Sequence, residues 1–572
     1  MSRRVAWLVD FVIIPALLAW LAFEPHCFDG AIVHNDEGGT LGPLIRILHG
    51  QIPYRDVFTL YGPLYLYLPA FLMMFFGKTL ATLRGYFQCA SMLNILAAYS
   101  VIRVLCQTRF FRYLTPLVLL LETSHPFWSS RWGGLRVGIT LLALRALAKF
   151  LKHRALRQLM WAGALTGFGL LYSTDTGLLL GFTTLGCTLW ISWTDRGPAP
   201  QALRRVLTAY LAGVGLVVSP CALYLASQGA LGAYLSTSFW VVPFRAHAIY
   251  TFVFPSLRFA YRHTGMLLDF LGSQTAMIYL PLVCYELSLA YVLAKVVLKR
   301  ISVEDGILVL LVLVGVLEYY ASFRAIFGPQ LQDALVPLIL LLAFVSERAV
   351  GTLRDAYVRA ANGNRISAGK VPACCVLLLA IVASLGLTWK PCFGTWRRWA
   401  WYQREKRTLV PGWTCDFQQV SDQDWRFLHT PRGGKSRLPR YQADDVDAVT
   451  GFLEQQTKPG ERVFAYPEQG AFNFFADRPG VSKFDITGYA ALSPRWRQEL
   501  LQTLDAARPR FVIRGRRPSF LAREQMGLHD EALPEVGSYL DQRYRVIQQF
   551  QTVELLARRD DPAIQPADPS AH

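Results

Sequence analysis

Apolar runs long enough to cross a lipid bilayer recur along the first 390 residues of this chain. A helix needs roughly 20 residues to cross about 30 Å of hydrocarbon. The 572-residue chain is 53% hydrophobic and 17% charged, and its mean hydropathy of +0.28 is too high for a water-soluble protein. We therefore expect a polytopic α-helical membrane protein with about 11–13 spans. The expected spans are roughly 5–23, 86–106, 113–128, 134–150, 158–172, 176–193, 205–226, 275–298, 304–322, 331–347 and 371–389.

The net charge of +18 fits the same picture. Cytoplasmic loops of membrane proteins carry an excess of Lys and Arg. If Arg3 and Arg4 lie in the cytoplasm, every strongly basic loop between the expected spans falls on the cytoplasmic side. The charge therefore indicates orientation in a membrane, with the N-terminus cytoplasmic, and nucleic acid is not expected as a partner.

That orientation requires the apolar run Pro63 to Phe76 not to cross the membrane. The run is shorter than a span, opens with Gly62-Pro63 and carries two tyrosines. We interpret it as a re-entrant or interfacial helix. If it crossed, every later basic loop would face outward.

The pattern changes after about residue 390. An aromatic and basic stretch from Trp396 to Arg404 is typical of a membrane interface. It leads into alternating helical and strand patterns, with helices expected at 444–457 and 494–507, strands at 462–466 and 510–514, and two paired strands within 544–557. We therefore expect a transmembrane part, 1–390, and a C-terminal soluble α/β domain, 391–572. An odd number of spans makes that domain extracytoplasmic.

The first outer loop, 24–85, carries the residues most indicative of chemistry. It contains Asp36 and Glu37 in the sequence HNDEGG, and Asp56 in the later sequence GQIPYRD. Neighbouring carboxylates repel each other, which can raise the pKa of one of them toward neutral pH, where it can act as a general base. Alternatively, Asp36 caps the following helix with Glu37 in its first turn, and Asp56 caps a turn.

This loop resembles the first extracytoplasmic loop of the GT-C superfamily of membrane glycosyltransferases. The resemblance rests on Asp36-Glu37-Gly38, Gly50, Pro53-Tyr54, Asp56 and Gly62-Pro63. The layout is similar to that of lipid A aminoarabinose transferases and protein O-mannosyltransferases. Two features depart from it: Pro63 is not preceded by a basic residue, and the next outer loop, 124–132, has no acidic one.

The resemblance implies an inverting glycosyltransferase of the bacterial inner membrane. It would transfer a sugar from a polyprenyl-phosphate donor to a cell-envelope glycan, lipid or protein by direct displacement of the polyprenyl phosphate. By the resemblance, Asp36 matches the acidic residue that activates the acceptor. The alternatives are a transporter or flippase for a lipid-linked sugar, although the chain shows no paired halves, and a non-catalytic membrane scaffold.

Such a transfer needs a carboxylate base, positive charge on the leaving phosphate and an apolar groove for the lipid. The candidate catalytic residues are Asp36, Glu37 and Asp56. Arginine suits a phosphate because its guanidinium group can donate hydrogen bonds to two phosphate oxygens at once. The candidate substrate-binding residues are Tyr61, Arg131, Arg136, Asp175, Arg245, Arg258 and Arg262.

Each of these substrate-binding candidates has a structural alternative. Arg131 and Arg136 could anchor helix ends at the interface, and Asp175 could cap a helix. The aromatic and basic loop 227–274 could form interfacial helices. Its two histidines, His247 and His263, are isolated, so no metal site is expected there. No organic cofactor is expected either, and the sequence leaves a need for a divalent cation open.

Overall fold

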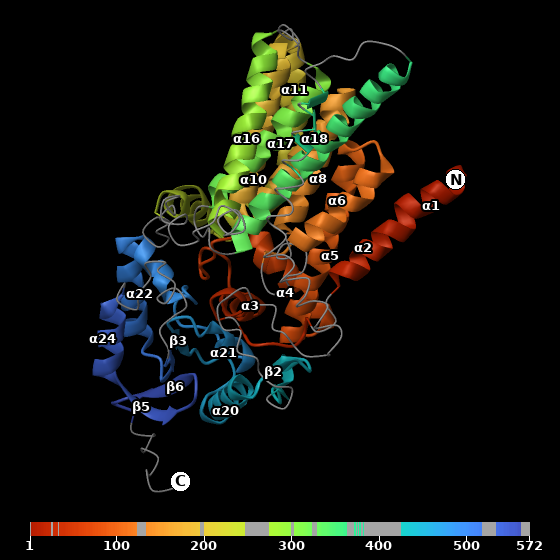
Figure 1. The fold of residues 1–572 in the computed structure, drawn as a ribbon. Helices are drawn as coiled ribbons and strands as arrows, with labels where there is room; N and C mark the ends of the chain where they lie inside the picture. The colour runs from red at the N-terminus through yellow and green to blue at the C-terminus, as the bar shows by residue number, and fades with distance from the viewer. Residues whose placement is uncertain are drawn as a thin grey trace.

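The computed structural model describes most of the chain. The described residues are 2–23, 27–32, 34–122, 133–194, 200–245, 274–298, 302–322, 329–362, 425–516 and 533–561, with isolated positions between 371 and 381. Long helices gather at one end, and a smaller domain of helices and strands lies at the other (Figure 1).

The first helical rod projects away from the other helices (Figure 1). It consists of α1 (Arg3–Leu8), the π-helical turn η1 (Val9–Ile13) and α2 (Ile14–Ala22). Trp7 and Trp20 are more than half exposed on it. Large exposed apolar side chains on a rod long enough to cross a bilayer are what lipid contact requires.

The remaining long helices follow the expected spans closely. They are α5 (Leu80–Leu105), α6 (Arg109–Glu122), α8 (Arg136–His153), α9 (Leu156–Tyr172), α10 (Thr174–Thr194), α11 (Pro200–Ser227), α16 (Gln274–Val297), α17 (Val303–Ser322) and α18 (Pro329–Ala361). The expected span 371–389 lies largely outside the described residues. Helix α18 runs beyond the expected end at 347, because Glu347, Arg348 and Arg354 end the apolar run but favour helix.

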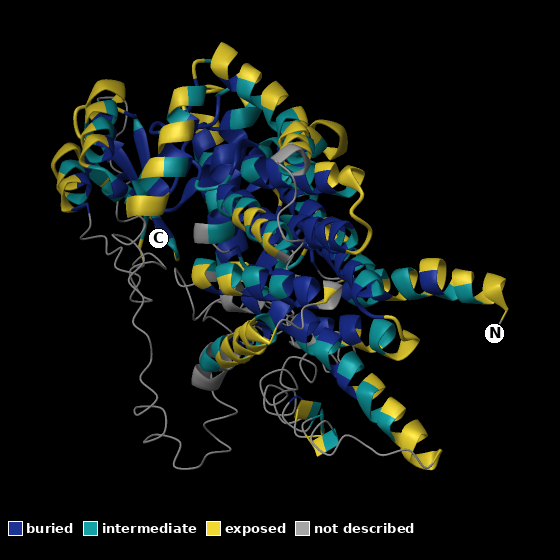
Figure 2. Cartoon of the chain, turned by 90° about the horizontal axis from the view of Figure 1, so that it is seen from above, coloured by how far each residue is buried: buried dark blue, intermediate teal, exposed yellow. Residues whose placement is uncertain are grey.

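Within the described part of the chain, five helical segments combine the length and hydropathy of a membrane span. They are Arg3–Ala22, Leu80–Leu105, Thr174–Trp193, Leu203–Ser227 and Asp333–Ala361. Buried residues fill the interior of the helical part and exposed ones mark its projecting rods (Figure 2). Helices α9 and α11 pack closely: a Cβ at Gly163 would lie only 2.1 Å from the carbonyl oxygen of Tyr210. Small residues allow this approach between helices in lipid.

Two short helices lie between the long helices and the C-terminal domain (Figure 1). The π-helical turn η2 (His34–Gly38) runs directly into α3 (Gly39–Leu48), and α4 spans Pro63–Phe76. Helix α4 matches the predicted short helix, and Gly77, with φ of 97°, ends it. Three short elements come after α11: α12 (Leu231–Ser236), the π-helical η3 (Thr237–Val241) and α13 (Val242–Arg245).

The C-terminal domain combines helices with two small sheets. Its helices are α20 (Arg440–Gln456), α21 (Gly470–Phe475), α22 (Pro494–Ala507) and α24 (Pro534–Arg543), with 3₁₀ turns η6 (Pro431–Gly433) and η7 (Thr487–Leu492). Its strands are β1 (Trp425–Phe427), β2 (Arg437–Pro439), β3 (Phe464–Tyr466), β4 (Phe511–Gly515), β5 (Tyr544–Gln549) and β6 (Val553–Arg558). Strands β1 and β2 pair antiparallel, and the larger sheet has the order β3-β4-β6-β5.

In that larger sheet β3 and β4 are parallel, and β6 is antiparallel to both of its neighbours. The expected helix at 494–507 and the pair of strands within 544–557 are both present.

Candidate active site

Asp36 lies in the first turn of the helical rod that η2 and α3 form together. The rod already begins at His34, so Asp36 lies inside the helix. Asp36 is therefore not the residue that caps the helix. Its side chain is half-buried. Burial, and secondarily the charge of Glu37, raise the pKa of Asp36 to about 7. A carboxyl group with that pKa can both take up and release a proton near neutral pH.

Glu37 sits in a different environment from its neighbour. Its carboxylate is fully buried and accepts from Arg84 of α5, with Nε–Oε1 at 2.6 Å and Nη2–Oε2 at 2.8 Å. Arg84 also donates to the carbonyl oxygens of Phe28 (2.6 Å) and Gly30 (3.1 Å). Because both oxygens of Glu37 are engaged away from solvent, the geometry favours an orienting role over proton transfer.

Asp56 closes a turn. Its Oδ2 accepts from the backbone N–H of Ile52 at 2.9 Å, and Arg55 donates to both carboxylate oxygens, at 3.0 and 2.8 Å. Partial burial acts to raise the pKa of Asp56, but these hydrogen bonds outweigh it and hold the pKa below its ordinary value. This is the turn-capping alternative, and it makes Asp56 a weak base.

Arg136, Asp175 and Tyr61 are brought together from α8, α10 and the segment that precedes α4. Arg136 begins α8, and its Nη2 lies 2.7 Å from Oδ2 of Asp175. Asp175 is the second residue of α10, and its Oδ1 also accepts from Ser173 and from the backbone N–H of Thr176. The guanidinium carbon of Arg136 lies 5.8 Å from the centre of the Tyr61 ring. The predicted residues thus form one cluster in which Asp175 fixes the arginine.

Gly62 allows this cluster to form. Its N–H donates to the carbonyl oxygen of Tyr172 at 3.0 Å, and a Cβ at Gly62 would lie 2.2 Å from the carbonyl oxygen of Leu171. Only glycine permits the start of α4 to touch the end of α9. The contact leaves Tyr61 stacked on Tyr65, with ring centres 4.2 Å apart, and beside Arg136.

Sequence reasoning missed four side chains around this cluster: Tyr86, Tyr172, Glu318 and Asp333. The hydroxyl of Tyr172 lies 2.7 Å from that of Tyr86 and accepts from the N–H of Leu135 at 3.1 Å. The charges of Asp333 in α18 and Glu318 in α17 act on Arg136. Isolated carboxylates in apolar spans are costly and often functional, so these two could have been noticed in the sequence.

Of the other predicted residues the structure describes Arg245 alone. Arg245 is exposed at the end of α13. Arg131, Arg258 and Arg262, together with His247 and His263, lie outside the described residues. In the part of the chain that the structure describes, no group of three or more His, Cys, Asp or Glu residues could hold a metal ion.

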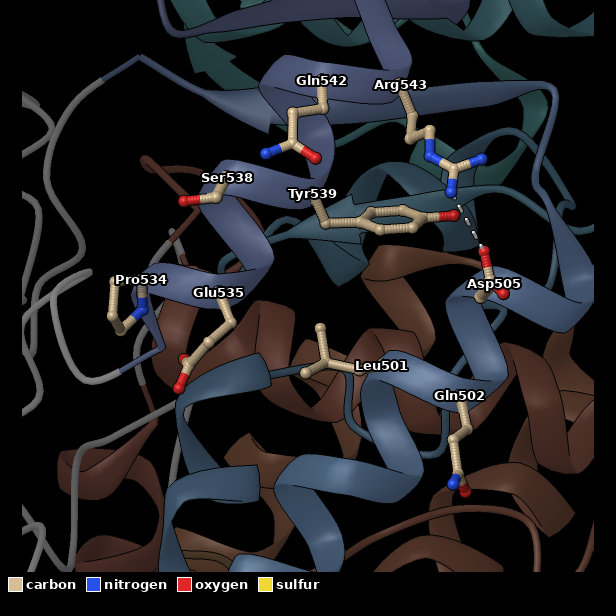
Figure 3. A pocket seen from close by; sticks show the side chains of 9 residues that line it. All are labelled: Leu501, Gln502, Asp505, Pro534, Glu535, Ser538, Tyr539, Gln542 and Arg543. Carbon is tan, nitrogen blue, oxygen red and sulfur yellow. Dashed lines mark ion pairs between the residues drawn. The ribbon is translucent and has the colours of Figure 1, made fainter.

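A groove on the C-terminal domain contains none of the predicted residues. It lies between α22 and α24, where the Tyr539 ring is flanked by Asp505 and Arg543 (Figure 3). An Arg543 nitrogen lies 3.8 Å from Oδ1 of Asp505, and most of the lining side chains are exposed.

Comparisons with known proteins give a likeness in fold. No family model matches the sequence, and no curated protein matches it. ArnT from Cupriavidus metallidurans, solved bound to undecaprenyl phosphate, is similar with a TM-score of 0.50 and 12% identity over 96% of this chain and 98% of that one. Its apo structure gives a TM-score of 0.51 and 12% identity over 97% and 98%. ArnT is an aminoarabinose transferase of the GT-C type.

The chain has the GT-C fold. The predicted fold is therefore confirmed: a polytopic α-helical membrane fold like that of ArnT, with a C-terminal region that combines helices and strands. An identity of 12% carries information on the fold alone, so the chemistry has to be argued from the residues of this chain.

Proposed function

We propose that this GT-C-fold protein transfers a sugar from a polyprenyl-phosphate-linked donor to a cell-envelope glycan, lipid or protein. The observation that carries the proposal is the connection between Asp36 and Arg136 through two stacked tyrosines. The charge of Asp36 acts on Tyr65, Tyr65 stacks on Tyr61, and Arg136 lies over Tyr61. A proton acceptor and a cation thus flank one aromatic surface, as a transfer from a phosphate leaving group requires.

In the proposed step Asp36 takes the proton from the attacking hydroxyl or amine of the acceptor. The acceptor atom forms a bond to the anomeric carbon while the bond from that carbon to the phosphate oxygen breaks. The electron pair leaves with the polyprenyl phosphate, and one displacement inverts the anomeric centre. Arg136, held by Asp175 at 2.7 Å, would stabilise the charge of the departing phosphate.

Glu37 and Asp56 would support this step from outside the reacting atoms. Glu37 fixes the rod of Asp36 to α5 through Arg84, and Asp56 closes the turn that leads to Tyr61. Tyr61 would offer a flat apolar surface to the donor. Arg245, Arg131, Arg258 and Arg262 remain candidates for binding the donor.

We further propose the orientation that the basic loops predict. The N-terminus would lie in the cytoplasm, and the C-terminal domain and the Asp36 rod would lie on the extracytoplasmic face of the inner membrane. ArnT has been solved bound to undecaprenyl phosphate, which supports a polyprenyl phosphate as the donor's carrier.

The test combines genetics with chemistry. Deleting the gene should remove one sugar from envelope glycans or glycolipids in mass spectrometry. The wild-type gene should restore that sugar, whereas Asp36→Asn should not, although it inserts in the membrane normally. Full restoration by Asp36→Asn would contradict the proposed chemistry and would favour a transporter or scaffold.

A further inference from the structure

The C-terminal domain contacts the helix that carries Asp36 along most of its length. The rod formed by η2 and α3 runs from His34 to Leu48, and α21 packs against both of its elements. Figure 1 shows α3 and α21 next to each other, at the boundary between the long helices and the C-terminal domain.

Glycines make the central part of this contact. A Cβ at Gly42 would lie 2.9 Å from Oδ1 and 3.0 Å from Cβ of Asp485. A Cβ at Gly470, the first residue of α21, would lie 3.2 Å from the Cα of Gly42. The two backbones therefore approach as closely as residues without side chains allow. Nearer to Asp36, a Cβ at Gly38 would lie 3.5 Å from Cβ of Ala471.

Side chains hold both ends of the rod. At the Asp36 end, His34 stacks on Phe472 of α21, with ring centres 6.0 Å apart and planes 9° from parallel. At the other end, Nη1 of Arg46 lies 3.7 Å from Oδ2 of Asp485 and donates to the carbonyl oxygen of Ser482. Arg46 and Asp485 are both almost fully buried, so their separation would leave a buried charge uncompensated.

We propose that the C-terminal domain positions the carboxylate of Asp36: it clamps the rod His34–Leu48 through close contacts at Gly38, Gly42 and Gly470. The proposal rests on the proposed function of Asp36 and assigns Asp485, Arg46 and Gly42 as positioning residues. A carboxylate on a short rod needs such support, because a displacement of about 1 Å can cost about 100-fold in rate.

Gly42→Ala tests the clamp, with Gly451→Ala as its matched control. Both glycines lie inside helices, so alanine favours the helix at both sites by up to about 1 kcal/mol. A Cβ at Gly451 of α20 would meet no atom within 4 Å. The full-length protein is purified, and kcat, the KM for the lipid-linked donor and the pH profile are measured. Hydrogen–deuterium exchange of peptides covering 34–48 reports on the rod without reference to activity.

We expect Gly42→Ala to lower kcat at least ten-fold with the donor KM within two-fold of wild type, and to speed exchange in 34–48. The acid limb of its pH profile should move to lower pH, because a displaced Asp36 meets more water. The other titratable groups near Asp36 are Glu37 and His34 on the rod and Tyr65 on α4, and the variant changes none of them. Gly451→Ala should match wild type throughout.

If Gly42→Ala does not accumulate, Gly39→Ala and its rescue decide the question. A Cβ at Gly39 would lie 2.8 Å from Cδ1 of Ile486, the atom that Ile486→Val removes. The double variant should therefore recover what Gly39→Ala loses. The inference fails if Gly42→Ala matches Gly451→Ala, or if Gly39→Ala is inactive and Ile486→Val restores nothing. An active Asp36→Asn would instead overturn the proposed function.

Discussion

Replacing Asp36 by asparagine should abolish transfer and at the same time stabilise the folded protein. Burial, with a smaller contribution from the charge of Glu37, raises the pKa of this carboxyl from 3.8 to about 7. Between these pH values the folded state binds more protons than the unfolded state, so stability falls as pH rises through that window. Above pH 7 the folded protein bears the full free-energy cost of burying the ionised Asp36 carboxylate, and asparagine removes that cost.

The size of the effect follows from the same pKa difference. The gap between 3.8 and about 7 is worth about 4 kcal/mol at 1.36 kcal/mol per pKa unit. Asp36 is only half-buried, so solvent screening reduces this to about 2 kcal/mol. For a chain of this size that corresponds to a rise of about 2 °C in melting temperature.

The assay is thermal unfolding of the detergent-solubilised protein at several pH values, alongside sugar transfer. The gain of Asp36→Asn should be largest above pH 7 and disappear below about pH 4. Asp56→Asn is the control, because hydrogen bonds lower the pKa of Asp56 and its loss should destabilise the protein above pH 4. An Asp36→Asn protein that is inactive but no more stable than wild type at pH 8 would refute the reasoning.

The remaining predictions concern pH, charge and topology. The kcat/KM for transfer should increase with pH to a plateau, with a midpoint near the Asp36 pKa of about 7; a midpoint near 4 would contradict the assignment. Arg136→Ala should weaken use of the lipid-linked donor about 10- to 100-fold, since a charge-assisted hydrogen bond is worth roughly 1.5–3 kcal/mol, and lysine should restore only part of the apparent affinity. Arg84→Gln should cost about 3–5 kcal/mol in thermal unfolding because it leaves Glu37 buried and uncompensated, and adding Glu37→Gln should recover most of it. An alkaline phosphatase fused after residue 400 should be active; an inactive fusion would mean that Pro63–Phe76 crosses the bilayer.

The parts of the fold that follow local sequence rules could be predicted. Gly62-Pro63 and Gly77 delimit α4, and the structure places its ends at Pro63 and Phe76. Ser493-Pro494 likewise starts α22, which ends at Ala507 as expected. Strands β5 and β6 are neighbours in the chain, so their alternation was readable, whereas the parallel pairing of β3 with β4 joins distant segments and left no local signal.

The start of α5 shows why the site was harder to predict from the sequence than the fold. The expected span began at 86, two residues after Arg84. The helix actually begins at Leu80, and Arg84 is fully buried because Glu37, far away in the chain, neutralises it. Arg46 of α3 and Asp485 of the C-terminal domain are likewise a buried ion pair of residues far apart in the sequence. A sequence shows each charge, but only the tertiary structure shows which charges are paired.

The two adjacent carboxylates of the first loop lie in different surroundings, which give them different roles. The sequence suggested that mutual repulsion would poise one of them, but burial is the larger cause at Asp36 and repulsion the smaller. Arg84 holds the carboxylate of Glu37 in place with two short hydrogen bonds and offsets its charge, which fits repulsion being the smaller cause at Asp36. Among the described residues nothing donates a hydrogen bond to the carboxylate of Asp36. A pair with one partner fixed and the other left to exchange its proton suits an acid–base step better than two equivalent carboxylates would.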